Sequence, residues 1–187
     1  MHLTRRNHLL LVLVTAAFAL LAALARAGPA PTSDERLKAA FLYRVLEYVE
    51  WPAGAREGPL TIAVLGDDRL VAELSRNVEG RKAHGRAIRA HAVRSAQEGL
   101  GADVLFVSQD RKRELAGVAR SNAHRPVLIV TEAAGALERG SVINLLEVDG
   151  KMRFEVSLPA AERRGLKLSS RLLAVALRVE TGLTPPA

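Results

Sequence analysis

Three short apolar runs recur along the middle of the chain, and each begins and ends abruptly. They cover residues 60–65, 104–107 and 127–130 and read LTIAVL, VLFV and VLIV. A nearly continuous apolar run of this length is typical of a strand that is buried on both faces. Because helices must then lie above and below the strands, the pattern predicts a single three-layer α/β domain with a mostly parallel sheet.

Around these runs, apolar residues recur at the spacing of amphipathic helices. Helices are expected over residues 32–50, 69–78, 110–121 and 170–180, with a short helical piece at 159–165. The first helix begins at a capping box formed by Thr32 and Glu35 and ends before Pro52. Its expected apolar face consists of Leu37, Phe41, Val45, Tyr48 and Val49. The last helix follows Ser169 as its cap, and it is expected to be buried because apolar residues cover most of its circumference.

A β-hairpin is predicted at about residues 142–158, on one side of the sheet. Asp149 and Gly150 form a two-residue turn signal between two strand-like segments, and they set Val148 opposite Lys151. On one face of the hairpin this register pairs Ile143 with Val156, Leu145 with Phe154, and Glu147 with Met152.

The opposite face of the hairpin is polar near its middle. There the register pairs Asn144 with Glu155 and Leu146 with Arg153. Solvent exposure, or a network between Arg153 and Glu155, is the favoured interpretation of this polarity. A ligand-binding role for the two charged residues is the alternative.

Residues 87–93 alternate between apolar or small side chains and charged ones, which predicts a strand at an edge of the sheet. The basic side chains around this strand are Arg81, Lys82, Arg86, Arg89 and Arg94. A solvated edge that discourages pairing with another sheet is the favoured interpretation of this cluster. The alternative is a surface that attracts an anion or a lipid headgroup.

The amino-terminal residues have the pattern of a secretory signal peptide. Arg5 and Arg6 precede an apolar segment at residues 9–25, and Ala25-Arg26-Ala27 provides a small-x-small cleavage pattern. We therefore expect a signal peptide at residues 1–27, a single domain at residues 28–187, and a periplasmic location. A retained membrane anchor is the alternative, although the segment is shorter than the ~20 residues of a typical transmembrane helix.

Composition and charge exclude several classes of function. Of the 187 residues, 27 are lysine or arginine and 20 are acidic. Loss of residues 1–27 removes three arginines, and the remaining net charge of +4 gives no basis for nucleic-acid binding. The chain contains no cysteine, which excludes disulfides, lipoprotein anchoring, thiol catalysis and thiolate metal sites.

Polar residues follow the predicted strands and would meet at the carboxyl edge of a parallel sheet, where ligands often bind. Asp67 and Asp68 follow the first run. They could ligate a hard cation or act in acid–base chemistry, but capping of the next helix is the favoured interpretation. The candidate ligand-binding residues are Asp67, Asp68, Thr131, Glu132, Arg153 and Glu155.

No catalytic constellation is evident along the chain. His84, His91 and His124 lack metal-ligand spacing, and there is neither a serine elbow nor a phosphate-binding loop. We therefore expect a protein that is not an enzyme and that holds neither a metal nor a cofactor. Trp51 and Tyr48 are candidate anchors for a protein partner, although packing in the core is the favoured role for both.

Several short segments, taken in their order and spacing, resemble the YfiR family of periplasmic proteins across nearly all of residues 37–179. They are 38–43 (KAAFLY), 49–52 (VEWP), 64–68 (VLGDD), 85–86 (GR), 104–108 (VLFVS), 125–128 (RPVL), 153–156 (RFEV) and 165–173 (GLKLSSRLL). Two features depart from the family pattern. Members often carry cysteines, whereas this chain has none, and Ser157 stands where the family usually has asparagine.

The resemblance implies a compact α/β domain that acts by binding another protein. Its best understood members form dimers and hold a membrane-bound diguanylate cyclase inactive through the periplasmic sensor part of the enzyme. By analogy, we expect a homodimeric regulator in cyclic di-GMP signalling that is near the membrane only through its partner, which is this cyclase or another sensor protein. The alternative is a periplasmic small-ligand-binding protein or enzyme that uses a pocket at the strand carboxyl ends.

Export with cleavage after Ala27 makes a simple prediction. Protein recovered from the periplasmic fraction should begin at Gly28, as determined by amino-terminal sequencing or intact mass. A full-length chain that stays in the membrane fraction would contradict both the cleavage and the periplasmic location.

Overall fold

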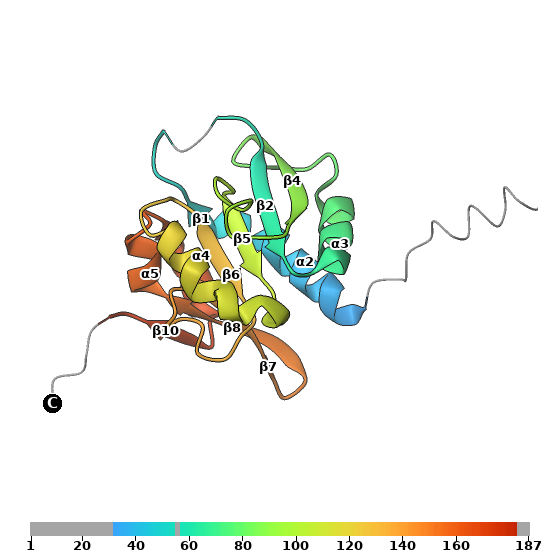
Figure 1. Ribbon diagram of the computed structural model, residues 1–187. Coiled ribbons are helices and arrows are strands. Elements are labelled where there is room, and N and C mark those ends of the chain that lie inside the picture. The colour runs from blue at the N-terminus through green and yellow to red at the C-terminus, as the bar shows by residue number, and fades with distance from the viewer. Residues whose placement is uncertain (1–31, 55–56, 183–187) are drawn as a thin grey trace, which may run out of the picture. The chain divides into compact units, whose positions relative to one another are not determined.

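The computed structural model describes residues 32–54 and 57–182, and Figure 1 shows their arrangement. The predicted signal peptide at residues 1–27 lies outside the described residues, as do residues 28–31, 55–56 and 183–187. Among the helices that the structure describes, none is long and apolar enough to span a membrane.

Eight strands form one sheet in the order β10-β8-β7-β6-β5-β2-β4-β3. Their bounds are β2 Leu60–Leu65, β3 Lys82–Ala83, β4 Arg86–Val93, β5 Val104–Val107, β6 Leu128–Thr131, β7 Ile143–Val148, β8 Lys151–Ser157 and β10 Arg178–Glu180. The five strands from β7 to β4 pair in parallel, while β3 and β8 pair antiparallel with β4 and β7. A separate antiparallel pair joins β1 (Val49–Glu50) to β9 (Lys167–Leu168). The predicted α/β class with a mostly parallel sheet is confirmed.

Helices cover both faces of the sheet, which gives the predicted three layers (Figure 1). Helices α2 (Ser33–Val45), α3 (Asp68–Val78) and α5 (Leu158–Glu162) share one core cluster, and α4 (Leu115–Ser121) contributes to a second. Alternate residues of a strand point to opposite faces, so Ile62 and Val64 of β2 lie in the first cluster and Ala63 and Leu65 in the second. The run at residues 60–65 is therefore buried on both faces, as predicted.

The hairpin has the predicted register throughout. Val148 lies opposite Lys151, and the pairs continue through Leu145 with Phe154 to Ile143 with Val156. Asp149 adopts a positive φ of 51° and Gly150 one of 69°, as a tight two-residue turn requires. The Asp149-Gly150 turn therefore predicted the register correctly. The apolar face favours the same register, because a slip of one residue would turn this whole face to solvent.

The prediction that the first helix continues to Glu50 is wrong. Helix α2 ends at Val45, and the 3₁₀-helix η1 (Leu46–Tyr48) leads into β1. In this segment Val49 pairs with Leu168, and the carbonyl of Tyr48 accepts a hydrogen bond from Ser169 N at 2.9 Å. The backbone of residues 48–50 thus pairs with the distant segment around β9, and these groups are not available for a longer helix. The buried face of α2 is made by Ala39, Leu42 and Val45, together with Glu35.

The last helix is also shorter than predicted. Helix α6 (Ser170–Ala174) begins after the Ser169 cap as expected, but residues 178–180 form β10, which extends the sheet beside β8. Leu177 N donates to the carbonyl of Phe154 at 2.8 Å and starts this pairing. The expectation of burial is wrong as well, since Val175 is 64% exposed and Leu177 is 45% exposed.

Two further boundaries differ from the sequence prediction. The helix expected over residues 110–121 starts as a 3₁₀-helix, η2 (Gln109–Glu114), before α4 begins. The short strand β3, just before β4, has no counterpart among the predicted elements.

A buried carboxylate joins the strands at their amino-terminal ends. Asp103, which is 2% exposed, accepts hydrogen bonds from Thr61 N at 2.8 Å and Thr61 Oγ1 at 3.1 Å. Its counter-ion is Arg86, whose Nη1 lies 3.2 Å from Asp103 Oδ1. Arg86 also donates to the carbonyls of Gly58 at 2.8 Å and Pro59 at 3.0 Å. The interpretation of the basic cluster as a solvated edge is therefore wrong for Arg86.

Replacement of Asp103 by alanine should destabilise the fold strongly. The change leaves Arg86 without its buried counter-ion, and the loss of one partner from such a pair typically costs about 3–5 kcal/mol. Urea unfolding measures this cost. Asp110→Ala is the control, because Asp110 is exposed and such surface changes stay within about 0.5 kcal/mol. Equal unfolding midpoints for the two variants would show that Asp103 has no special role.

Candidate functional site

Asp67 caps a helix. Its Oδ1 accepts a hydrogen bond from Leu70 N at 2.9 Å, which satisfies one of the free amides at the start of α3. Asp68 is the exposed first residue of the same helix, where its charge is favourable near the helix amino terminus. The capping interpretation is confirmed, and neither carboxylate lines a described cavity at the strand ends.

Thr131 lies inside the protein within a chain of polar contacts. Its Oγ1 donates to Asn144 Oδ1 at 2.8 Å and lies 2.9 Å from Ser141 Oγ. Asn144 Oδ1 also accepts from Ala133 N at 3.0 Å, and Asn144 Nδ2 donates to Glu155 Oε1 at 3.0 Å. These contacts hold β6 against β7. Because Thr131 is buried, it presents no group to a ligand.

Glu155 continues this polar chain to the last strand. Its Oε2 accepts from Arg178 Nε at 3.0 Å and lies 2.9 Å from Arg178 Nη2. The hydrogen bond with Glu155, foremost among several causes, raises the pKa of Arg178 above its ordinary value. The predicted network between Arg153 and Glu155 is therefore wrong. Arg153 is exposed and forms no ion pair with any described residue.

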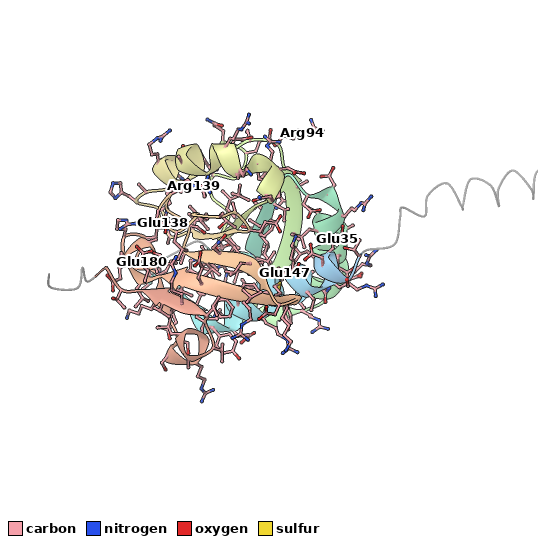
Figure 2. The ribbon with its side chains drawn as sticks, turned by 90° about the horizontal axis from the view of Figure 1, so that it is seen from below. Glu35, Arg94, Glu138, Arg139, Glu147 and Glu180 are labelled. Carbon is pink, nitrogen blue, oxygen red and sulfur yellow. The ribbon has the colours of Figure 1, made fainter. Side chains whose placement is uncertain are left out.

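Glu132 is the one predicted strand-end carboxylate that lines a cavity. This cavity, which we call the strand-end cavity, has a volume of about 420 Å³ and lies between the start of α2 and the hairpin. Its walls are Ser33, Asp34, Leu37, Lys38, Gln109, Glu132, Leu145, Leu146, Glu147, Gly150 and Met152. Figure 2 shows Glu147 close to helix α2, in agreement with this lining.

The central charges of this cavity are already paired. Lys38 Nζ lies 2.6 Å from Asp34 Oδ2 and also forms an ion pair with Glu132, while Gln109 N donates to Glu132 Oε1 at 3.0 Å. Burial acts to lower the pKa of Lys38, but its hydrogen bonds and attraction to Glu132 and Asp34 outweigh this and raise it. Lys38 was not among the predicted site residues, although its i, i+4 spacing from Asp34 is visible in the sequence.

Trp51 and Tyr48 lie in different surroundings. Trp51 is partly buried, donates from Nε1 to the carbonyl of Asp103 at 3.3 Å, and packs edge-on against His84 with ring centroids 6.1 Å apart. These contacts agree with the favoured packing role. The favoured packing role is wrong for Tyr48, which is 38% exposed and lines a separate groove on the surface.

This groove, which we call the Tyr48 groove, is mostly apolar. It has a volume of about 250 Å³ and is lined by Phe41, Arg44, Val45, Tyr48, Phe154, Arg171, Leu172 and Val175. The ring centroids of Phe41 and Phe154 lie 5.2 Å apart, so that side chains of α2 and β8 pack together in its lining. The sequence analysis assigned Phe41 to the core and Val175 to a buried helix, and it therefore missed the groove.

The described residues contain no group of three or more His, Cys, Asp or Glu side chains placed to hold a metal ion. The predicted site residues are thus dispersed. Asp67 caps a helix, Thr131 and Glu155 belong to an internal polar chain, Glu132 lines the strand-end cavity, and Tyr48 lines the groove.

Comparisons with known proteins agree on the family and the fold. The model of the YfiR/HmsC-like family matches residues 35–177. A crystal structure of a conserved domain protein from Vibrio cholerae is similar to this chain with a TM-score of 0.56 and 13% identity, and the match covers 81% of this chain. The ABC domain from Streptococcus pneumoniae, solved in complex with L-Trp, matches with a TM-score of 0.53 and 14% identity over 78% of this chain.

The chain spans about three fifths of those two structures, 62% of the first and 60% of the second. At such low identity the likeness establishes the fold alone.

The two adjacent carboxylates provide a matched test of the capping geometry. Asp67→Ala removes the side-chain acceptor for Leu70 N and should lower the free energy of unfolding by about 1 kcal/mol. Asp68→Ala removes only a favourable charge near the helix terminus and should cost a few tenths of that amount. Urea denaturation of both variants measures the difference. A larger loss for Asp68→Ala would contradict the assignment of the cap.

Proposed function

The chain belongs to the YfiR/HmsC-like family, and from that premise we propose that it is a non-catalytic periplasmic regulator of a membrane-bound signalling enzyme. In this proposal the enzyme is a diguanylate cyclase, and the regulator holds it inactive by binding its periplasmic part. The regulator works as a homodimer. The proposal rests on the family resemblance for the partner and on the Tyr48 groove for the contact.

The Tyr48 groove is the observation that carries the proposal. Tyr48 and Val175 are exposed side chains in its lining, which also contains the packed rings of Phe41 and Phe154. Buried aromatic and aliphatic anchors in pockets supply most of the energy in protein interfaces. A groove of this size accommodates one or two apolar side chains of a partner and leaves little room for a large ligand.

Charge at the groove defines the kind of segment that fits it. Arg44 and Arg171 both line it, and both are exposed. Neither forms an ion pair with a described residue. We therefore favour a partner segment that inserts an apolar side chain and carries acidic residues beside it. Such complementary charges increase the association rate and the specificity of a complex.

The strand-end cavity supports a second candidate function, the binding of a small ligand. The cavity is larger than the groove, and apolar side chains and paired charges both line it. A pocket that combines apolar walls with a few polar groups is typical of small-molecule sites. In this alternative Lys38 and Glu132, which come from different elements, would contact the ligand.

A groove variant should release the cyclase. Val175→Glu places a charge at the border of the apolar groove and repels acidic groups of the partner, while its exposed position leaves the fold intact. In a strain that lacks the gene, cyclic di-GMP output should rise. The wild-type gene should restore repression, and Val175→Glu should not.

Two further variants give this experiment its specificity. Leu100→Glu makes the same change at an exposed leucine outside the groove and should repress normally. Leu37→Glu introduces the same glutamate at the strand-end cavity. Repression that is lost with Leu37→Glu and retained with Val175→Glu would contradict the groove and favour the second candidate. The Asp67→Ala, Asp68→Ala double variant should still repress, because neither residue lines the groove.

A further inference from the structure

A second surface cavity has an unusual concentration of arginine. It has a volume of about 450 Å³ and lies between α4, the loop before β7 and the segment after α5. Its walls are Ala116, Ala119, Arg120, Ala123, Glu138, Arg139, Gly140, Arg163 and Arg164. With four guanidinium groups and one carboxylate, the cavity carries an excess of positive charge. We call it the arginine cavity.

Arg164 is buried in this wall without a counter-ion. The residue is 5% exposed, and it donates from Nη1 to the carbonyl of Ala160 at 2.8 Å and from Nη2 to the carbonyl of Gly140 at 3.1 Å. Its Nε is buried and has no hydrogen-bond acceptor among the described residues. Burial, and then the neighbouring charge of Arg163, lower the pKa of Arg164.

An uncompensated charge of this kind is costly for a folded protein. Two neutral carbonyl groups satisfy part of the guanidinium, but they do not balance its charge. Arg163 adds a second positive charge beside it, and no carboxylate lies within ion-pair distance of either residue in the described part of the chain. An anion in the cavity would relieve this cost.

The other two arginines extend the positive surface. Arg139 is held in place by hydrogen bonds to the carbonyls of Gly135 at 3.0 Å, Ala134 at 2.6 Å and Lys112 at 3.3 Å. Figure 2 shows Arg139 beside helix α4. Arg120 is exposed on α4 and makes no ion pair with the described residues, so its donors are free to contact a ligand.

Small residues keep the cavity open between these charges. Ala116, Ala119 and Ala123 follow one side of α4 and its end, where longer side chains would fill the space. Gly140 has a φ of +99°, and a Cβ at this position would lie 2.7 Å from the Cβ of Ala119. The loop can therefore approach the helix closely only with glycine at this position.

We propose that the arginine cavity binds a phosphate group, carried by a small soluble molecule or by a lipid headgroup. Guanidinium groups match the tetrahedral oxygens of phosphate with paired hydrogen bonds, and they bind it more strongly when they are partly desolvated. Arg120 and Arg163 would contact the phosphate from opposite walls, and the fixed charges of Arg139 and Arg164 would attract it. This site is separate from the Tyr48 groove, and it does not depend on the identity of the protein partner.

The test uses exposed arginines, so that the fold stays intact. Isothermal titration with inorganic phosphate and with glycerol phosphate compares the wild-type protein with the double variant Arg120→Gln, Arg163→Gln. The affinity of the double variant should fall by about tenfold or more, because two charge-assisted contacts are lost. The matched control is Arg36→Gln, Arg89→Gln, which removes the same charge from exposed positions outside the cavity and should bind like the wild type.

A second arm of the experiment identifies the source of the phosphate. Co-sedimentation with vesicles of phosphatidylglycerol, and with vesicles of phosphatidylcholine as the reference, detects headgroup binding. Dependence on Arg120 and Arg163 in either arm supports the proposal and assigns the source. The proposal is overturned if both double variants behave alike in both arms, or if the wild type neither binds phosphate better than chloride at equal ionic strength nor binds phosphatidylglycerol vesicles better than phosphatidylcholine vesicles.

Discussion

The buried carboxylate of Asp103 is the contact on which the arrangement of the sheet depends. It receives hydrogen bonds from β2 and an ion pair from Arg86 at the start of β4, while its own backbone immediately precedes β5. The carbonyl of the same residue accepts from Leu128 N at 2.9 Å and from Trp51 Nε1, which adds β6 and the segment after β1. Four parallel strands and the chain's only tryptophan therefore meet at one residue. Buried charges persist in proteins where their pairing is complete, and a complete set of this kind specifies one alignment of the strands.

A second polar chain fixes the other half of the sheet and thereby the position of the Tyr48 groove. It runs from Thr131 through Asn144 and Glu155 to Arg178, and so connects β6, β7, β8 and β10. With β8 held in this way, the ring of Phe154 packs against Phe41 in the lining of the Tyr48 groove. The parallel pairing of β10 with β8 turns the chain after α6 into the sheet, and this leaves Val175 exposed at the groove. The Tyr48 groove is thus a consequence of how the edge of the sheet is completed.

Local chemistry determined the parts of the fold that the sequence could predict. The apolar runs predicted the inner strands, the Asp149-Gly150 turn predicted the hairpin register, and the acidic pair after β2 predicted a helix cap. The errors arose where distant segments compete for backbone groups. Val49 and Val179 lie in helical patterns, but pairing with Leu168 and Val156 makes them strand residues. Asp103, Arg86 and the arginine cavity could not be predicted either, because each requires side chains that meet only after the strands have been ordered.

We propose that this member of the YfiR/HmsC-like family acts through the Tyr48 groove. Hydrogen–deuterium exchange of residues 28–187, measured with and without the periplasmic part of the proposed cyclase partner, is the sharpest test of this contact. Residues 41–48, 152–156 and 171–177 line or flank the groove, and their backbone amides should become protected in the complex. Protection that is confined to residues 33–38 and 145–152, around the strand-end cavity, would contradict it.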